Sequence, residues 1–294
     1  MTKRILLTGA TGTVASSLTQ SLVERGHFVR ALVRNPDKAA APREAGAELV
    51  TGDFANEGAL RAAFDGIDTA FLVVPAGPDA AKSNRALFAA AKAAGAPHVV
   101  RLSVIKSAID GPTDNTKLHG ESDRDLVASG LPYTLLRPHF FMQNLLGSVK
   151  GIAKDGVFYL GMGRGRLGMI DTRDITDAAF AVLDGDRARH LGKAYDLTGP
   201  ASIDFDQVAA TLSQALGATV KYVAVPPEAV VQTMKSMGAS DWMSNVLGQY
   251  SKAYSENWGD FVTGDVKAVT GHEPRSFETF AREVLVPMIR AARG

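Results

Sequence analysis

The sequence contains no cysteine, and this absence removes several kinds of chemistry at once. Disulfides, thiolate nucleophiles, iron–sulfur ligation and redox-active thiol pairs are all excluded. Any redox reaction of this protein therefore depends on a bound cofactor.

The chain also has little net charge and no long apolar run. It has 32 Lys and Arg against 31 Asp and Glu, with no basic run interleaved with aromatic residues, so the footprint of nucleic-acid binding is missing. No apolar run approaches the length of a membrane span, and the N-terminus leads into a strand pattern without the apolar stretch of a signal peptide. We expect a cytoplasmic protein with neither a nucleic-acid nor a membrane partner.

What the chain does have is a regular alternation of strand and helix patterns. With 294 residues, 46% of them hydrophobic, it is long enough for one large core or for a core and a smaller satellite. Alternation of this kind is typical of βαβ units in a parallel sheet. The predicted strands are residues 5–7, 28–33, 48–50, 70–74, 98–103 and 133–136, and the predicted helices between them include 79–94 and 117–129.

After residue 150 the pattern loosens. A helix over 174–183 and a strand over 194–197 are expected to return to the first sheet, whereas 204–216, which opens with the capping-box spacing of Asp204 and Gln207, and 276–289 are expected to be helices of a second part. The fold prediction is α/β: a Rossmann-type doubly wound parallel sheet with a smaller C-terminal α/β substrate lobe. The expected first domain is the Rossmann-type domain, residues 1–155, which segments from about 170–200 rejoin. The expected second domain is the smaller substrate lobe, formed mainly by residues 156–294.

A glycine-rich turn joins the first strand to the first helix. Gly9 suits a tight turn, Gly12 lets the main chain approach a pyrophosphate, and Ala15 stands where the third glycine of a dinucleotide-binding fingerprint often lies. The N–H groups and dipole at the start of a helix favour such an anion. Because a strand precedes this turn and an apolar helical face follows it, we expect a bound dinucleotide rather than a simple turn.

The second strand ends in Arg34-Asn35-Pro36, without the carboxylate that would accept the ribose hydroxyls of NAD. A guanidinium fork suits a 2′-phosphate. The sequence therefore favours NADPH/NADP+ over NADH, the alternative being that Arg34 is simply solvated.

Ligands of doubly wound sheets lie at the carboxyl ends of the strands, so residues just after each strand are further candidates. Asp53 and Phe54 would meet the adenine, although Asp53 has an equal alternative as a turn or helix-cap residue. Val74-Pro75 would lie along the ribose and phosphates, and Ser103 beneath the nicotinamide. Phe140 and Phe141 would form a pocket wall or, equally, part of the core.

Several of these segments together resemble the NmrA-like atypical short-chain dehydrogenases/reductases, over nearly the whole chain. The segments that carry the resemblance are Thr8-Gly9-Ala10-Thr11-Gly12, residues 32–36, Gly52-Asp53-Phe54, residues 129–138 followed by Asn144, residues 171–175, residues 195–200 and residues 270–277. The resemblance implies a Rossmann fold and NADP(H) binding. It leaves the activity broad, because the family includes NADPH-dependent quinone, azo-dye, triphenylmethane-dye, isoflavone-type and imine reductases and also non-catalytic NADP-sensing regulators.

The acid–base chemistry departs from that of most short-chain dehydrogenases. Their Tyr-x-x-x-Lys spacing reads here from Thr113 to Lys117, and threonine cannot replace the phenol as an acid. Lys117 is a candidate to bind the ribose or donate a proton, with a solvated lysine as the alternative. His119 is a candidate proton shuttle near neutral pH, although a packing or capping role is the favoured reading of a lone histidine.

The segment from 227 to 258 is dense in Met, Trp and Tyr, which would stack on a flat substrate or, more commonly, form helix core or a dimer face. A homodimer is thus one alternative for it. The expected catalytic residues are Lys117 and His119, and no metal site is expected. The expected cofactor contacts are Gly9, Thr11, Gly12, Thr13, Val14, Arg34, Asp53, Phe54, Val74, Pro75, Ser103, Lys117, Pro138 and Phe140, and the expected substrate contacts are His139, Phe141, Asn144, Met237 and Trp242.

The function predicted from all of this is an NADPH-dependent reductase that transfers hydride to a planar electrophilic small molecule such as a quinone, an azo or triarylmethane dye, an imine or an enone. Without the tyrosine acid, an electrophilic acceptor is favoured because the hydride does most of the work. The alternative is an NADP(H) sensor that acts through protein partners.

Overall fold

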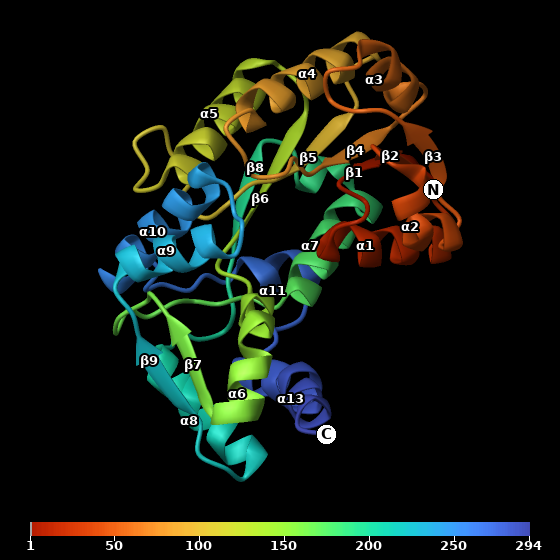
Figure 1. The fold of residues 1–294 in the computed structure, drawn as a ribbon. Helices are drawn as coiled ribbons and strands as arrows, with labels where there is room; N and C mark the ends of the chain where they lie inside the picture. Colours follow the sequence, from red (N-terminus) through yellow and green to blue (C-terminus); the bar gives the residue numbers. More distant parts are fainter. Residues whose placement is uncertain (1) are drawn as a thin grey trace.

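The computed structural model describes residues 2–294, and its dominant feature is a seven-stranded parallel sheet (Figure 1). Every neighbouring pair in this sheet is parallel. The strands in spatial order are β3 (Glu48–Thr51), β2 (Phe28–Val33), β1 (Arg4–Thr8), β4 (Thr69–Leu72), β5 (His98–Leu102), β6 (Tyr133–Pro138) and β8 (Lys193–Leu197). This order reverses direction between β1 and β4, so the doubly wound Rossmann prediction is confirmed.

Helices cover both faces of the sheet, as its hydrophobic strands require. One face packs on α1 (Thr13–Glu24) and α7 (Thr172–Asp184), and Leu18, Leu22 and Ile175 are fully buried there. The opposite face packs on α3 (Glu57–Phe64), α4 (Ala80–Ala93) and α5 (Asp114–Ala128), around Phe64 and Leu87. Figure 1 shows these two helix layers on either side of the strands. A short helix, α2 (Ala40–Glu44), and the 3-10 helix η1 (Pro36–Lys38) follow β2.

A separate hydrophobic core lies in the lower half of Figure 1. It surrounds the parallel pair β7 (Val157–Leu160) and β9 (Lys221–Ala224) and includes Phe158, Phe205 and Phe280, all buried. The remaining elements of this half are η2 (Met142–Ser148), α6 (Val149–Asp155), α8 (Phe205–Leu216), α9 (Pro227–Ser236), α10 (Asp241–Ser255), α12 (Phe277–Phe280), the π-helical turn η4 (Ala281–Leu285) and α13 (Val286–Ala292). Two further elements belong to the large sheet: α11 (Asp265–Thr270) contacts α7 and β8, and η3 (Arg187–Arg189) precedes His190, whose carbonyl accepts from Thr134 of β6.

Two boundaries differ from the prediction for reasons that concern proline. The strand expected to stop at 136 runs to Pro138, which needs no N–H at the last strand position and whose carbonyl accepts a hydrogen bond from the Ile105 N–H (3.1 Å). The single helix expected over 276–289 is interrupted by the π-helical turn η4 just before Pro287, whose ring nitrogen cannot donate to the preceding turn.

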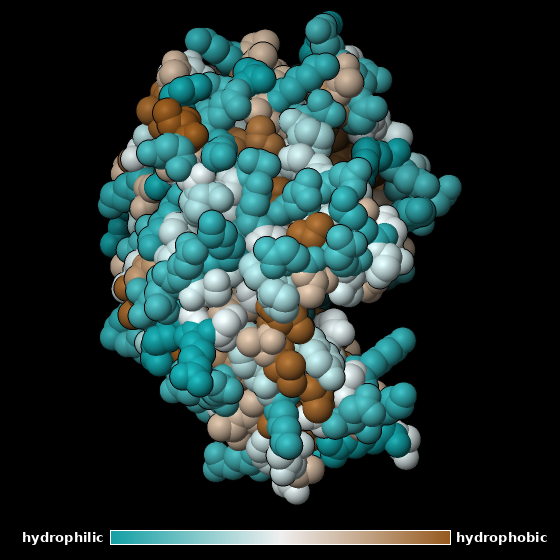
Figure 2. Space-filling model, turned by 60° about the vertical axis from the view of Figure 1, so that its left-hand side comes forward, coloured by the Kyte–Doolittle hydropathy of each residue, from teal (hydrophilic) through white to brown (hydrophobic). Residues whose placement is uncertain are grey.

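The face of the molecule drawn in Figure 2 is mostly hydrophilic. Figure 2 shows it hollowed on one flank between the upper and lower halves, with apolar residues gathered in a short strip in the lower half. Within residues 2–294, no helix combines the length and the apolar character needed to cross a membrane.

Candidate functional site

The turn after β1 has the geometry that its glycines predicted. Gly9 has a left-handed backbone (φ +64°), and a Cβ atom there would lie 3.0 Å from the Cβ of Val73, so both the turn and the close approach of the next strand require glycine. The Gly12 N–H donates to the Gly9 carbonyl (2.8 Å), and Gly12 is the N-cap of α1. The first turn of α1 therefore opens directly from this loop, with its N–H groups available to an anion.

A cleft of about 520 Å³ lies along the carboxyl ends of β1 to β4. Seven of the predicted cofactor residues line it, from four different strand ends: Gly9, Thr11, Arg34, Asp53, Phe54, Val74 and Pro75. Other residues that the sequence analysis did not single out also line the cleft, among them Lys38 and Ser83. Of the other predicted contacts, Val14 is buried in the α1 core, and Gly12 and Thr13 lie at the start of the helix beside the cleft.

The end of β2 carries two exposed cations, Arg34 and Lys38, and both line the cleft. Asn35, which lies between them, accepts a hydrogen bond from the Asp37 N–H (2.9 Å) and so caps η1. The strand end has Arg34 and lacks the carboxylate that would bind an unphosphorylated ribose diol. This part of the cleft is suited to a dianionic phosphate.

Asp53 lies in the cleft, and its carboxylate already has one structural role. Its Oδ1 accepts a hydrogen bond from the Ala55 N–H (2.9 Å), which forms the turn that was the alternative reading of this residue. The adenine contact predicted for Asp53 remains a prediction for the other carboxylate oxygen.

The carboxyl ends of β5 and β6 surround a buried carboxylate, Asp123 of α5. It forms an ion pair with Arg101 and accepts hydrogen bonds from Ser103 (3.0 Å), Ser107 (2.7 Å) and Arg137 (3.1 Å to Nη2). Of these partners only Ser103 was singled out from the sequence. Arg101 and Asp123 are 2% and 4% exposed, so this network is an interior one that orders the strand ends.

His119, one of the two predicted catalytic residues, belongs to the same network. Its Nδ1 lies 3.1 Å from Nη2 of Arg101, and both burial and the charge of Arg101 hold the imidazole pKa well below its usual value. The ring is therefore neutral at physiological pH. The expectation that His119 shuttles protons by titrating near neutral pH is wrong, because a guanidinium stands against one ring nitrogen.

Lys117, the other predicted catalytic residue, is exposed on the first turns of α5. Its Nζ lies 3.6 Å from Asp114 Oδ1, an ion pair between two half-exposed side chains. That Lys117 binds the ribose or donates a proton remains a prediction.

Thr113 is the N-cap of α5, and its side chain accepts a hydrogen bond from the Thr116 N–H (3.0 Å). It is fully buried, and this capping role explains a threonine at the position where other enzymes place a phenol. A phenol from α10 does lie near the start of α5: Tyr250 accepts a hydrogen bond from the Asn115 side-chain amide (3.0 Å). Nothing in the local sequence pairs these two positions, which are 135 residues apart.

The predicted substrate residues have diverse environments. His139 is 2% exposed, its Nε2 donates to the Gly259 carbonyl (2.9 Å) and its Nδ1 accepts from the Phe140 N–H (2.7 Å). Burial lowers its pKa to about 4, so it is a neutral core histidine, and its prediction as a substrate contact is corrected. Phe140, which was predicted as a cofactor contact with a core position as its alternative, packs edge-on against Phe205 and Tyr254 in the lower core.

Four further substrate candidates lie on separate elements. Phe141 is half-buried and packs against the core beneath the large sheet, and Asn144 is exposed in η2. Trp242 is half-buried in the first turn of α10, whereas Met237 is 74% exposed at the end of α9. Met237 therefore lies on the surface, and contact of any of the four with a substrate remains a prediction.

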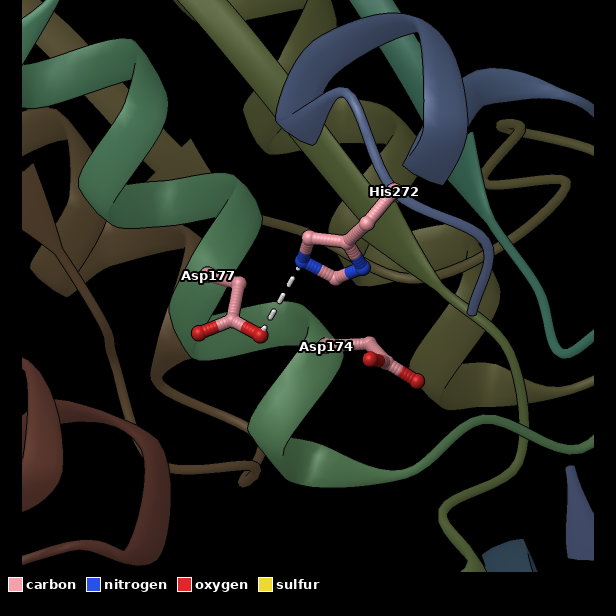
Figure 3. Close-up of side chains that lie close together, drawn as sticks. All are labelled: Asp174, Asp177 and His272. Atoms are coloured by element: carbon pink, nitrogen blue, oxygen red, sulfur yellow. Dashed lines mark ion pairs between the residues drawn. The ribbon is translucent and has the colours of Figure 1, made fainter. Parts of the chain in front are cut away.

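Asp174, Asp177 and His272 are the one group within residues 2–294 with the spacing of a metal site (Figure 3). The His272 Nε2 lies 3.3 Å from Asp177 Oδ2, the pair joined in Figure 3. Arg275 forms ion pairs with both carboxylates, and its main-chain N–H donates to Asp174 Oδ2 (2.8 Å). The positive charge that these carboxylates need is thus supplied by Arg275, and the cluster ties α7 to the segment before α12.

Comparison with known proteins gives a consistent set of relatives. The NAD(P)H azoreductase of Xenophilus azovorans is 36% identical over 278 residues, which cover 95% of this chain and 96% of that protein. The structure of the NADPH-dependent quinone oxidoreductase QOR2 of Escherichia coli, complexed with NADPH, has a TM-score of 0.85 and 27% identity, covering 99% of this chain and 100% of that one.

A third structure, the negative transcriptional regulator NmrA in complex with NADP, has a TM-score of 0.82 at 22% identity, with 99% of this chain and 97% of that chain covered. It shares the fold. The model of the NmrA-like family matches residues 1–277. Together with the glycine turn and the cleft at the ends of β1 to β4, this match establishes that the chain belongs to the NmrA-like family.

Proposed function

We propose that this protein is an NADPH-dependent reductase that acts on a planar electrophilic small molecule. The observation that carries the proposal is the cleft along β1 to β4, with Arg34 and Lys38 at the strand end where a 2′-phosphate would lie. The azoreductase and quinone oxidoreductase relatives support the reaction class.

The residues of the cleft fit a phosphorylated dinucleotide. A side chain at Gly9 would collide with Val73, so the glycine lets the turn pack closely against the end of β4 in its left-handed conformation. The N–H groups of the loop and of α1 would hold that diphosphate, Arg34 and Lys38 the 2′-phosphate, and Phe54 the adenine. Val74 and Pro75 would then lie along the ribose.

When bound, the reduced nicotinamide supplies the hydride. In a doubly wound sheet this end of the ligand lies past the switch between β1 and β4, toward the ends of β5 and β6. Ser103 directly follows β5 there, and Lys117 lies on α5. We propose that Lys117 contacts the ribose, and that residues 156–294 contribute most of the substrate lobe.

The lack of a phenol at Thr113 supports an electrophilic substrate. The hydroxyl of Thr113 is buried and caps α5, so it is not free to transfer a proton. Acceptors that draw a hydride without prior protonation, such as quinones, azo dyes and triarylmethane cations, suit such a site better than simple ketones do.

A second candidate function is a non-catalytic NADP(H) sensor. It is favoured by the NmrA regulator, which has the same fold over 97% of its own chain. The sensor needs the cleft along β1 to β4 but no reactive pocket beside the nicotinamide.

The two functions are separated by following NADPH oxidation by absorbance with quinones, azo dyes, triarylmethane dyes and cyclic imines, in parallel with NADPH binding by calorimetry. If the protein is a reductase, we expect turnover with at least one acceptor. In a Gly9→Val control we expect loss of both turnover and NADPH binding. Tight NADPH binding without turnover on the whole panel would refute the reductase and favour the sensor. Failure of wild-type protein to bind NADPH would refute both.

A further inference from the structure

The contact between Arg101 and His119 determines which form of the imidazole is present. Nη2 of Arg101 lies 3.1 Å from Nδ1 of His119. A guanidinium has only donors, so Nδ1 must be the acceptor and cannot carry a proton. The proton of the neutral ring is therefore on Nε2. A second proton on Nδ1 would place an N–H against the N–H of a fixed cation.

Arg101 is itself held from three sides and cannot turn away. It lies on β5, fully within the interior, where its Nη1 forms an ion pair with Asp123 and its Nε donates to Asn84 Oδ1 (3.3 Å). Asp123 in turn accepts from Ser103 and Ser107, and Ser103 therefore has no proton left for His119. The tautomer of His119 is built into a network of buried groups from β5, α4 and α5.

The other ring nitrogen belongs to a side chain that is only partly buried. Within residues 2–294, Nε2 of His119 has no hydrogen-bond partner, and it is not one of the two side-chain polar atoms, on Asn115 and Asp196, that are buried without one. The ring also lies beside Ser103, whose Oγ is 3.5 Å from Nδ1, at the carboxyl end of β5. This is the part of a doubly wound sheet at which ligands bind.

We propose that Arg101 and Asp123 are positioning residues that hold His119 as a permanently neutral imidazole, whose Nε2–H donates a hydrogen bond to the heteroatom of the substrate that gains negative charge during reduction. This inference rests on the proposed reductase function. Hydride adds to one atom of the acceptor, the π-electron pair moves to the quinone oxygen or the second azo nitrogen, and His119 stabilises that anion until a proton arrives from water. A neutral imidazole suits this task, as a fixed donor does in other enzymes that polarise a carbonyl.

The proposal distinguishes between substrate classes. A quinone or an azo dye develops an anion when it accepts hydride, whereas a triarylmethane cation accepts hydride at carbon and becomes neutral, with no heteroatom anion to stabilise. Loss of one such donor lowers turnover by about 100-fold. We expect that loss in His119→Ala with menadione or an azo dye, and a change of about twofold or less with a triarylmethane cation.

His119→Gln is the matched variant, because its amide nitrogen occupies roughly the place of Nε2 and can still donate. We expect it to recover about tenfold of the activity that His119→Ala loses with menadione. Equal losses in both variants, or equal losses on anion-forming and cationic substrates, would overturn the proposal and leave His119 a structural residue.

A measurement that needs no turnover tests the tautomer directly. In ¹⁵N-labelled protein, the imidazole nitrogens of His119, assigned by their absence from His119→Gln, should show a protonated Nε2 and a bare Nδ1 from pH 5 to 8. Menadione added to the NADP+-loaded protein should shift Nε2 of His119, while the buried His139, whose Nε2 is bonded to Gly259, serves as the unshifted control.

These outcomes separate the inference from the proposed function. A protein without reductase activity but with the expected tautomer and a menadione-dependent shift at Nε2 would refute the reductase and retain the hydrogen-bond donor. A ring that titrates between pH 5 and 8, carries its proton on Nδ1, or is unmoved by menadione would overturn the inference in an active enzyme as well. Arg101→Lys, where it folds by circular dichroism, should mix the two tautomers, because the ammonium cannot hold Asp123 and His119 together as the guanidinium does.

Discussion

The choice between NADPH and NADH should depend on Arg34 more than on any other single side chain. Arg34 is the first residue after β2 and lies with Lys38 on the rim of the cleft. Arg34→Ala removes one charge-assisted contact with a 2′-phosphate, and such contacts contribute about 1.5–3 kcal/mol. Because Arg34 is exposed, the lower end applies, and at about 1.4 kcal/mol for each tenfold change the KM for NADPH should rise about tenfold.

The same change should leave NADH almost unaffected, because NADH has no phosphate at this position. We expect a rise in its KM of about twofold or less. Arg34→Asp should weaken the binding of NADPH and strengthen that of NADH. The new carboxylate repels the 2′-phosphate and is the group that a ribose diol prefers at a strand end. The KM for NADPH should then rise by about 100-fold while that for NADH falls, if the loss of attraction and the new repulsion are each about one tenfold step.

The assay is a pair of initial-rate series with one acceptor and either cofactor, or calorimetric titration of each cofactor if turnover is slow. Lys82→Ala is the matched control, because Lys82 is also an exposed cation but lies on α4 outside the cleft lining. Added salt should narrow the difference between the cofactors in the wild type. Equal effects of Arg34→Ala on NADPH and NADH, or an equal effect of Lys82→Ala on NADPH, would refute the assignment of the phosphate site.

Three further predictions follow from other parts of the structure. Gly9→Ala should lower the free energy of unfolding by about 1–2 kcal/mol, since φ is +64° there. It should also abolish the rise in Tm that NADPH produces in the wild type. A Gly9→Ala variant with the same Tm as the wild type would contradict this prediction. His98 and His139 have pKa values lowered to about 4 by burial, so both stay neutral in the folded chain while the unfolded chain binds protons. The free energy of unfolding should therefore fall as the pH drops from about 6.5 to 4, by about 3 kcal/mol for each histidine. Urea unfolding measures this fall, which should shrink in His98→Asn. EDTA should leave Tm unchanged, because Arg275 already neutralises Asp174, whereas Arg275→Met should lower it; a fall with EDTA that a divalent ion reverses would reveal a metal site.

The parts of the fold that were predicted correctly are those with local signals. The strand β2 was predicted over the same residues that it occupies, 28–33, since a largely apolar run between polar turns is a property of neighbours in the chain. The start of α8 is similar: Asp204 accepts from the Gln207 N–H (2.8 Å), and the Gln207 side chain accepts from the Asp204 N–H (3.1 Å), as the capping-box spacing predicted. The start of α5 was placed three residues late, because its box uses Thr116 where Glu or Gln is usual.

The cleft was predictable for a related reason. The carboxyl ends of parallel strands lie at one edge of a sheet, so once the strands were known, the residues after them could be brought together without knowledge of any side-chain contact. Gly9, Arg34, Asp53 and Val74 come from four strand ends and line one cleft. The same rule drew attention to Ser103.

The sequence alone therefore determined the fold class and the cofactor cleft, because both depend on local periodicity, on turn chemistry and on a general rule about strand ends. The tertiary structure decided what the individual polar groups do. His119 contacts Arg101 from 18 residues away, and His139 is enclosed by Gly259 from 120 residues away. A titrating histidine, a fixed neutral donor and a core residue look the same in the sequence, because protonation depends on burial and on the charge of a partner that only folding brings into contact.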